Sequence, residues 1–189
     1  MPLYAFEGKS PYVHPEAWIA PTATLVGDVH VEARASIWYG AVLRADFGPI
    51  FIRAGANIQD GSVLHSGPEP TIVGPGTTVG HLCVVHNCVI GAEALIGNGA
   101  VVQDGARIGD HVLVGAGSLV PPNMVIPDEQ LALGAPATVR GPLTETARWW
   151  VEVNPDAYQS LAARHRDGVV EVPHPVDHGR GGAGPDGTG

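Results

Sequence analysis

The sequence of 189 residues has little of several features that define common classes of protein. It contains two cysteines, Cys83 and Cys88, which are too few for a disulfide framework. No run of about 18 apolar residues is present, and the N-terminus lacks a basic patch followed by an apolar core. We therefore expect neither a transmembrane helix nor a signal peptide, and we predict a cytoplasmic location. With 10 basic and 19 acidic residues, the formal charge of −9 argues against a nucleic acid or a membrane as partner.

Aromatic residues make up only 6% of the chain, although 44% of the residues are hydrophobic. A core can therefore form, but it must consist mainly of small aliphatic side chains. The 26 glycines and 17 prolines indicate frequent turns. This mixture favours many short strands over a helical bundle or a long disordered chain.

Aliphatic residues recur every six positions along most of the chain. The series runs through Ile19, Leu25, Val31, Ile37 and Leu43, then Ile52, Ile58 and Leu64, then Val73, Val79 and Val85, and after one step of five through Ile90, Ile96, Val102, Ile108, Val114 and Val120. The fourth residue after each of these is small or β-branched, with Phe47 as the main exception. A period of six does not match the 3.6 residues of a helical turn, so the pattern predicts a narrow solenoid with flat walls.

This repeat resembles that of the hexapeptide-repeat proteins, which form left-handed parallel β-helices with three six-residue faces per coil. The resemblance implies an all-β solenoid, and we assign residues 1–140 to it. Residues 141–168 are expected to be helical, because Thr144 is a capping residue followed by acidic residues. Asn154 and Pro155 give a second start signal, for either a second helix or a kinked continuation. We expect packing on the solenoid through Trp149 or Trp150, Tyr158 and Leu161, and a disordered tail over 169–189.

The repeat register brings some of the nine histidines together. Arg44, His65 and His86 follow aliphatic residues that open the same face on successive coils, so they should stack at about 4.8 Å on one wall. His81 lies one coil above Asp60 on a different wall. A metal ion held by all three histidines would therefore lie between two neighbouring solenoids, and threefold closure would give a homotrimer with three such sites.

The motifs R-A-D at 44–46, N-I-Q-D-G-S-V-L-H at 57–65 and V-G-H-L-C-V-V-H at 79–86 are similar to those of the γ-class carbonic anhydrases. That family consists of trimers of left-handed β-helices with three-histidine metal sites between subunits. The resemblance implies that His65, His81 and His86 bind Zn²⁺, with Fe²⁺ or Co²⁺ as alternatives. It also implies that Gln59 contacts the reactive water, that Arg44, Asp46 and Asp60 form polar contacts between subunits, and that Tyr158 lies near the site. The substrates would be CO₂ and bicarbonate.

The chain departs from the archetypal members at two places near the histidines. The stretch after His65 is only S-G-P-E-P, so the long acidic loop with its proton-shuttling glutamate is missing and Glu69 is the sole nearby acid. Phe47 follows Asp46 where the archetype has a glutamate. Two alternatives stay open for this reason: an acyltransferase or thioesterase acting on CoA thioesters, and a catalytically silent, metal-binding trimeric scaffold.

Overall fold

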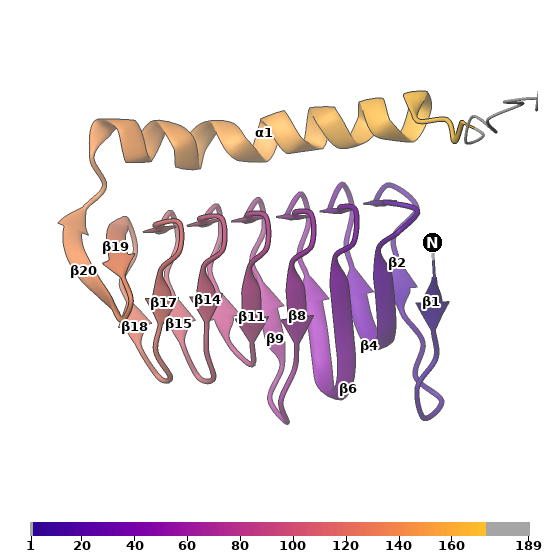
Figure 1. The fold of residues 1–189 in the computed structure, drawn as a ribbon, viewed down its shortest axis with the longest axis horizontal. Coiled ribbons are helices and arrows are strands. Elements are labelled where there is room, and N and C mark those ends of the chain that lie inside the picture. Colours follow the sequence, from indigo (N-terminus) through magenta and orange to yellow (C-terminus); the bar gives the residue numbers. More distant parts are fainter. Residues whose placement is uncertain (1, 173–189) are drawn as a thin grey trace, which may run out of the picture.

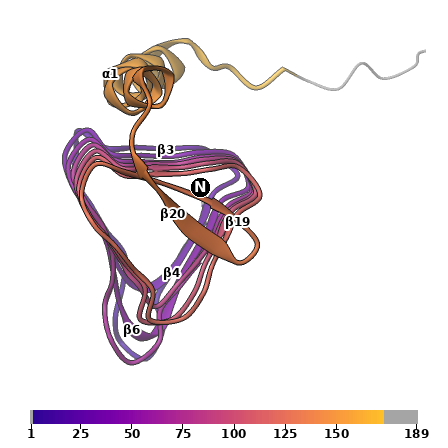
Figure 2. The same cartoon turned by 90° about the vertical axis from the view of Figure 1, so that its left-hand side faces the viewer.

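The computed structural model describes residues 2–172 of the chain. Short strands wind into a parallel solenoid, and one long helix runs along its outside (Figure 1). The solenoid is triangular in cross-section (Figure 2), because each coil contributes a strand to three walls. The predicted fold, a left-handed parallel β-helix built from hexapeptide repeats with a C-terminal helix, is confirmed.

Each wall consists of parallel strands one above the other. The first, which we call the helix wall, contains β3 (Trp18–Ile19), β5 (Ser36–Ile37), β7 (Asn57–Ile58), β10 (Thr78–Val79), β13 (Leu95–Ile96), β16 (Leu113–Val114) and β19 (Gln130–Gly134), and β20 (Ala137–Pro142) pairs antiparallel with β19. The second, the histidine wall, contains β1 (Leu3–Tyr4), the first parts of β4 (Thr24–Val31) and β6 (Val42–Ile52), and β8 (Val63–His65), β11 (Val84–His86), β14 (Val101–Val102) and β17 (Leu119–Val120). The third wall contains β2 (Tyr12–Val13), the last parts of β4 and β6, and β9 (Thr71–Val73), β12 (Val89–Ile90), β15 (Arg107–Ile108) and β18 (Val125–Ile126).

The interior is the aliphatic stack that the period of six predicts. Every residue of the six-residue series is buried, and so are nearly all the small residues that follow four positions later. The stacking of strands also extends beyond the series from Ile19 to Val120, because Leu3 pairs with Leu25 before it and Val125–Ile126 continues the third wall after it.

The one step of five residues shifts the local register. We expected Val89 to occupy the small buried position of its coil, but it is partly exposed and pairs with Ile72 and Arg107 on the outside of the third wall. Cys88 takes the buried position instead and is only 2% exposed. Because the step from Val85 to Ile90 is one residue short, Cys88 occupies the place that the fourth residue holds in the other coils. Side chains alternate along a strand, so the next residue, Val89, faces outward.

The C-terminal segment is a single helix, α1 (Glu145–Gly168). The hydroxyl oxygen of Thr144 accepts a hydrogen bond from the amide of Ala147 at 3.2 Å, which confirms the predicted N-cap. Pro155 lies inside the helix, so the second start signal marks neither a new helix nor a break between two helices. Beside the proline, the side-chain amide of Asn154 donates to the carbonyl of Trp150 at 2.6 Å.

Helix α1 lies along the helix wall and contacts β3, β5, β7 and β16 (Figures 1 and 2). Its buried residues are Ala147, Val151, Pro155 and Ala162, and Tyr158 and Leu161 pack against the core as expected. The tryptophans do not anchor it, since Trp149 and Trp150 are 54% and 49% exposed. Short side chains allow the helix axis to approach the flat wall more closely than an indole would.

The predicted disordered tail over 169–189 lies mostly outside the described residues. Only residues 169–172 of it are described, directly after α1. Among residues 2–172, no helix has the length and apolar character needed to cross a membrane.

Candidate functional site

The stacked residues of the histidine wall lie in the predicted register. Arg44 pairs with His65, and His65 pairs with His86, on three successive strands. The imidazoles are tilted against each other with 5.0 Å between ring centroids, and Nδ1 of His65 lies 3.0 Å from Nε2 of His86. The ring of Phe47 meets the His65 ring edge to face, with 6.0 Å between the ring centroids, and the Phe47 side chain is 69% exposed. An exposed aromatic side chain therefore lies beside His65 and His86.

Each of these two histidines has a carboxylate on its other nitrogen. Oδ1 of Asp46 lies 2.7 Å from Nε2 of His65, and Oδ1 of Asp104 lies 3.0 Å from Nδ1 of His86. Desolvation acts to raise the pKa of both carboxyls. Hydrogen bonds from His65 and Arg44 outweigh it at Asp46, and the charge and hydrogen bond of His86 outweigh it at Asp104, so both pKa values lie below the ordinary range.

This arrangement fits a divalent metal. A carboxylate accepts a hydrogen bond, so we assign the proton of each neutral ring to the nitrogen that faces Asp46 or Asp104. The two nitrogens that face each other then both carry lone pairs, which a shared cation would satisfy. Two ligands of one tetrahedral zinc lie about 3.3 Å apart, given bonds of 2.0–2.1 Å, and the observed separation is 3.0 Å. Carboxylates that orient ligating histidines in this way are typical of zinc sites.

His81 lies at the other edge of the histidine wall, on the corner that follows the helix wall. Its Nδ1 is 2.9 Å from Oδ2 of Asp60, as the register predicts, which leaves Nε2 as the available ligand. Within residues 2–172 of one chain, no group of three or more His, Cys, Asp or Glu side chains could hold a metal ion. One chain therefore presents a pair of histidines at one edge of the wall and a third histidine at the opposite edge.

The remaining predicted residues lie around a cavity of about 380 Å³ between α1 and the corner that carries His81. Gln59, His81 and Tyr158 all line it. Gln59 is 3% exposed and donates through Nε2 to Oδ1 of Asn57 at 3.0 Å, and Asn57 donates to the hydroxyl of Thr78 at 2.8 Å. These two hydrogen bonds fix the orientation of the Gln59 carboxamide. Its oxygen is then the atom that can accept a hydrogen bond from a bound molecule.

Tyr158 is held by an aromatic contact with the solenoid. Its ring meets that of Trp38 edge to face at 5.4 Å, and Trp38 donates from its indole nitrogen to the hydroxyl of Ser36 at 3.0 Å. Burial, together with the charge of Asp60, raises the pKa of Tyr158. The phenol is therefore a hydrogen-bond donor throughout the neutral range.

Two supporting residues were given no role in the sequence analysis. Asp104 contacts His86 and lies outside the quoted motifs, whereas Asn57 contacts Gln59 and is the first residue of the motif at 57–65. The register contained a signal for Asp104, because Val102 pairs with Val85 and so places the residues after Val102 beside those after Val85. Cys83 is buried in the core, as expected for a packing residue, and burial raises the pKa of its thiol.

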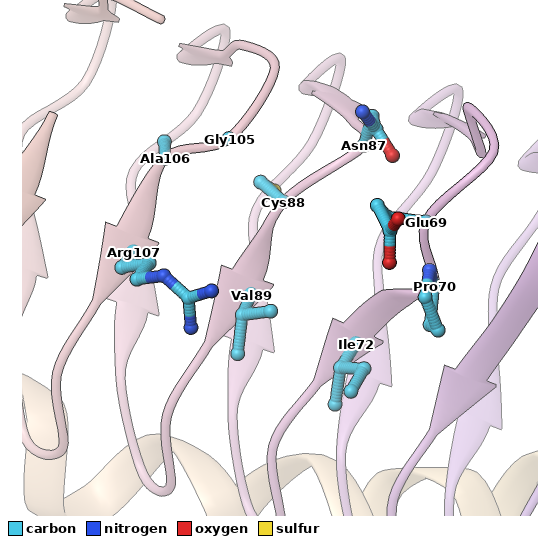
Figure 3. Close-up of a pocket in the computed structure, with 9 residues that line it drawn as sticks. All are labelled: Glu69, Pro70, Ile72, Asn87, Cys88, Val89, Gly105, Ala106 and Arg107. Carbon is cyan, nitrogen blue, oxygen red and sulfur yellow. The ribbon is translucent and has the colours of Figure 1, made fainter. Parts of the chain in front are cut away.

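The short coil also shapes the outside of the third wall. Cys88 and Val89 line a groove of about 300 Å³ together with residues of the 66–70 loop and of the coil that carries Arg107. Figure 3 shows the Arg107 side chain extending toward Val89, with Glu69 and Pro70 on the other side of Val89. Burial raises the pKa of the Cys88 thiol to about 12, so the thiol is protonated at neutral pH and packs in the wall at 2% exposure.

The comparisons with known proteins cover most of the chain. The family model "Bacterial transferase hexapeptide (six repeats)" matches residues 87–122. Carnitine operon protein CaiE of Citrobacter koseri is 44% identical over 173 residues, which cover 91% of this chain and 88% of that protein. The Salmonella typhi protein of the same name is 41% identical and covers 91% and 87%. This chain belongs to the hexapeptide-repeat, γ-class carbonic-anhydrase-like family.

Solved structures of this family have the same fold. A hexapeptide transferase family protein from Anaplasma phagocytophilum is 36% identical, covers 86% of this chain and 96% of its own, and superposes with a TM-score of 0.82. A Bacillus cereus protein named as an acetyltransferase is 38% identical, covers 87% and 96%, and has a TM-score of 0.85. Names within the family thus refer to acyl transfer, and the enzyme class has to be argued from the site.

Proposed function

We propose that the protein is a carbonic anhydrase that acts as a homotrimer and hydrates CO₂ to bicarbonate at interfaces between subunits. One observation carries this proposal: His65, His86 and His81 each have one ring nitrogen held by a carboxylate, which leaves one nitrogen per ring for a metal. In a threefold arrangement, the corner of one copy that carries His81 approaches the edge of the next copy that carries His65 and His86. The three free ring nitrogens then lie close together. Three imidazoles with an open fourth position are the ligand set of catalytic zinc.

The residues of this chain have separate roles in the proposed reaction. A divalent metal, when bound, lowers the pKa of a water molecule to about 7 and so provides the nucleophile at neutral pH. Gln59 orients the reacting molecule through its carboxamide oxygen, and Asn57 fixes Gln59. Arg44 and Asp46 hold His65 in its tautomer, and Asp60 does the same for His81. Tyr158 donates a hydrogen bond from the roof of the cavity.

Proton release is the step for which this chain provides the least. Glu69 lies in the short 66–70 loop and lines the groove of the third wall. Phe47 occupies the position beside His65 at which an acidic residue could accept a proton. We therefore expect the turnover rate to rise with the concentration of a small buffer such as imidazole.

Stopped-flow CO₂ hydration tests the proposal on trimeric protein loaded with Zn²⁺, or with Fe²⁺ in the absence of oxygen. We expect activity that His86→Ala abolishes and that His111→Ala leaves unchanged, because His111 pairs with Glu93 at the corner that follows the third wall. A metal-loaded trimer without CO₂ hydration would contradict the carbonic anhydrase assignment.

Acyl transfer is the second candidate, and the names of the related structures are the observation that favours it. Hydrolysis or transfer of an acyl group from a CoA thioester, together with thermal stabilisation by CoA, would support it. The silent scaffold is distinguished by a third outcome, in which the triple variant His65→Ala, His81→Ala, His86→Ala still forms the trimer and the wild type has neither activity. The cytoplasmic location stays a prediction.

A further inference from the structure

Two large apolar side chains of the solenoid are unusually exposed. Leu82 is 71% exposed and Phe47 is 69% exposed, and among residues 2–168 no other large apolar side chain reaches these values. Both lie next to candidate metal ligands, since Leu82 directly follows His81 and the Phe47 ring meets that of His65. One of them therefore lies at each edge of the histidine wall.

A leucine is a costly residue at position 82. Its φ is +57°, and the corresponding corner residues of the neighbouring coils are Gly61 and Gly99, with φ of +67° and +68°. The left-handed region is unfavourable for a residue with a Cβ atom, and the exposed side chain gains little burial in return. Such a conformation at a candidate site indicates that the side chain has a use outside the single chain.

Both exposed side chains reach the same level of the solenoid. A Cβ atom at Gly61 would lie 2.7 Å from Cδ2 of Leu82, so the leucine lies against Gly61, one coil nearer the N-terminus than His81. Gly61 belongs to the coil that ends with His65, and Phe47 approaches His65 from the preceding coil. Leu82 and Phe47 thus extend to the same coil from opposite edges of the histidine wall.

The wall between these two edges is apolar on its outer face. The outward-facing residues of successive strands form one row, which consists of Val42, Val63, Val84, Val101 and Leu119. Val63 and Val84 are each 39% exposed. Parallel sheets are usually covered on both faces, and a contiguous apolar surface on an open face indicates an interaction site. Because Val84 lies between Leu82 and His86 along the chain, this surface is continuous with the proposed subunit interface.

We infer that Leu82 of one copy packs against Phe47 of the next copy at each interface of the trimer. This contact rests on the proposed function, because joining His81 to His65 and His86 across an interface is what brings the two edges together. The contact buries both side chains and so offsets the backbone cost at Leu82. It also gives the aromatic residue at position 47 a role, since a carboxylate there would be buried against a leucine without a partner.

A double-mutant cycle on trimer dissociation tests the contact, measured by sedimentation equilibrium in EDTA and again in Zn²⁺. We expect Leu82→Ala and Phe47→Ala each to weaken association by about tenfold per interface, because each truncates a buried apolar side chain. The double variant should be little weaker than either single variant, since the two side chains share one contact. Val125→Ala removes a side chain of similar exposure from the third wall and should leave association unchanged. Fully additive effects of the two substitutions would overturn the contact.

Disulfide trapping tests whether the two positions lie together across the interface. In the double variant Leu82→Cys, Phe47→Cys, oxidation by diamide should produce covalently linked trimers on a non-reducing gel. Either single variant should run as a single chain, and so should Leu82→Cys combined with Val125→Cys. The native Cys83 and Cys88 are buried and present in all of these variants, so any linkage that they form appears in the controls as well.

The outcomes separate this contact from the proposed function. A trimer that hydrates CO₂ but shows neither coupling nor cross-linking would overturn the contact alone. Coupling and cross-linking in a metal-loaded trimer that does not hydrate CO₂ would support the contact and contradict the proposed reaction. A chain that is monomeric with and without Zn²⁺ would overturn both. The strain at Leu82 is a separate quantity, because unfolding of the dissociated chain reports the strain and dissociation of the trimer reports the contact.

Discussion

At the scale of single residues, the carboxylates behind the histidines decide how well a metal is held. Asp104 contacts Nδ1 of His86 at 3.0 Å and fixes which nitrogen carries the proton. We expect Asp104→Asn to weaken Zn²⁺ affinity by about 10- to 100-fold, because an amide is a poorer acceptor and can present its NH₂ group instead. Competition with a chromophoric chelator measures this. Asp156→Asn, on the exposed side of α1, is the control, and equal affinities of the two variants would contradict the assigned role.

Leu82, the residue after His81, has a backbone conformation that is costly for its type. Its φ is +57°, whereas the equivalent corner residues Gly61, Gly99 and Gly117 are glycines with φ of +66° to +68°. Its side chain is 71% exposed, so no burial compensates within one chain. We expect Leu82→Gly to raise the free energy of unfolding by about 1 kcal/mol. Urea denaturation checks this against Leu82→Ala, which removes the side chain but not the strain and should not stabilise the chain.

At the scale of elements, His165 joins the C-terminal half of α1 to the solenoid alongside the packing of Tyr158, Leu161 and Ala162. Nδ1 of His165 lies 3.1 Å from the hydroxyl of Tyr39, and its ring packs 4.9 Å from Trp38 and 5.3 Å from Trp18. We expect His165→Ala to cost about 1–3 kcal/mol and to speed amide hydrogen exchange in residues 158–168, because a hydrogen bond and aromatic contacts are lost together. His111→Ala should change neither quantity, and the same exchange rates in both variants would show that the helix is held elsewhere.

Local pattern determines the walls of this molecule but not the way the helix packs on them. The period of six predicts most of the buried aliphatic residues and the stacking of His65 and His86, because successive coils repeat the same register. Val89 was predicted at the wrong position because the step of five residues before Ile90 places Cys88 and Val89 one position differently from the other coils. His165 matched no motif, since its partners Trp18, Trp38 and Tyr39 come from residues more than a hundred positions earlier and only tertiary packing brings them together.

At the scale of the whole molecule, the proposed site requires two copies of the chain, and mixing two defective variants tests this directly. One variant lacks the histidine pair (His65→Ala, His86→Ala) and the other lacks the corner histidine (His81→Ala). Each alone should bind no metal at the site, because every interface in its trimer is incomplete. In a mixed trimer, one of the three interfaces joins an intact pair to an intact corner histidine. Random assembly from equal amounts should therefore restore about a quarter of the sites.

Metal content per trimer after co-refolding and desalting measures this recovery, and refolding the two variants separately before mixing provides the control. A site contained within one chain would give no recovery at any ratio, since each variant lacks at least one ligand. A recovery near a quarter would require the pair and the corner histidine to come from different subunits. It would also explain the distribution of residues along the histidine wall: the two edges of one chain carry complementary parts of a site, so folding of the solenoid fixes each part and threefold closure joins them.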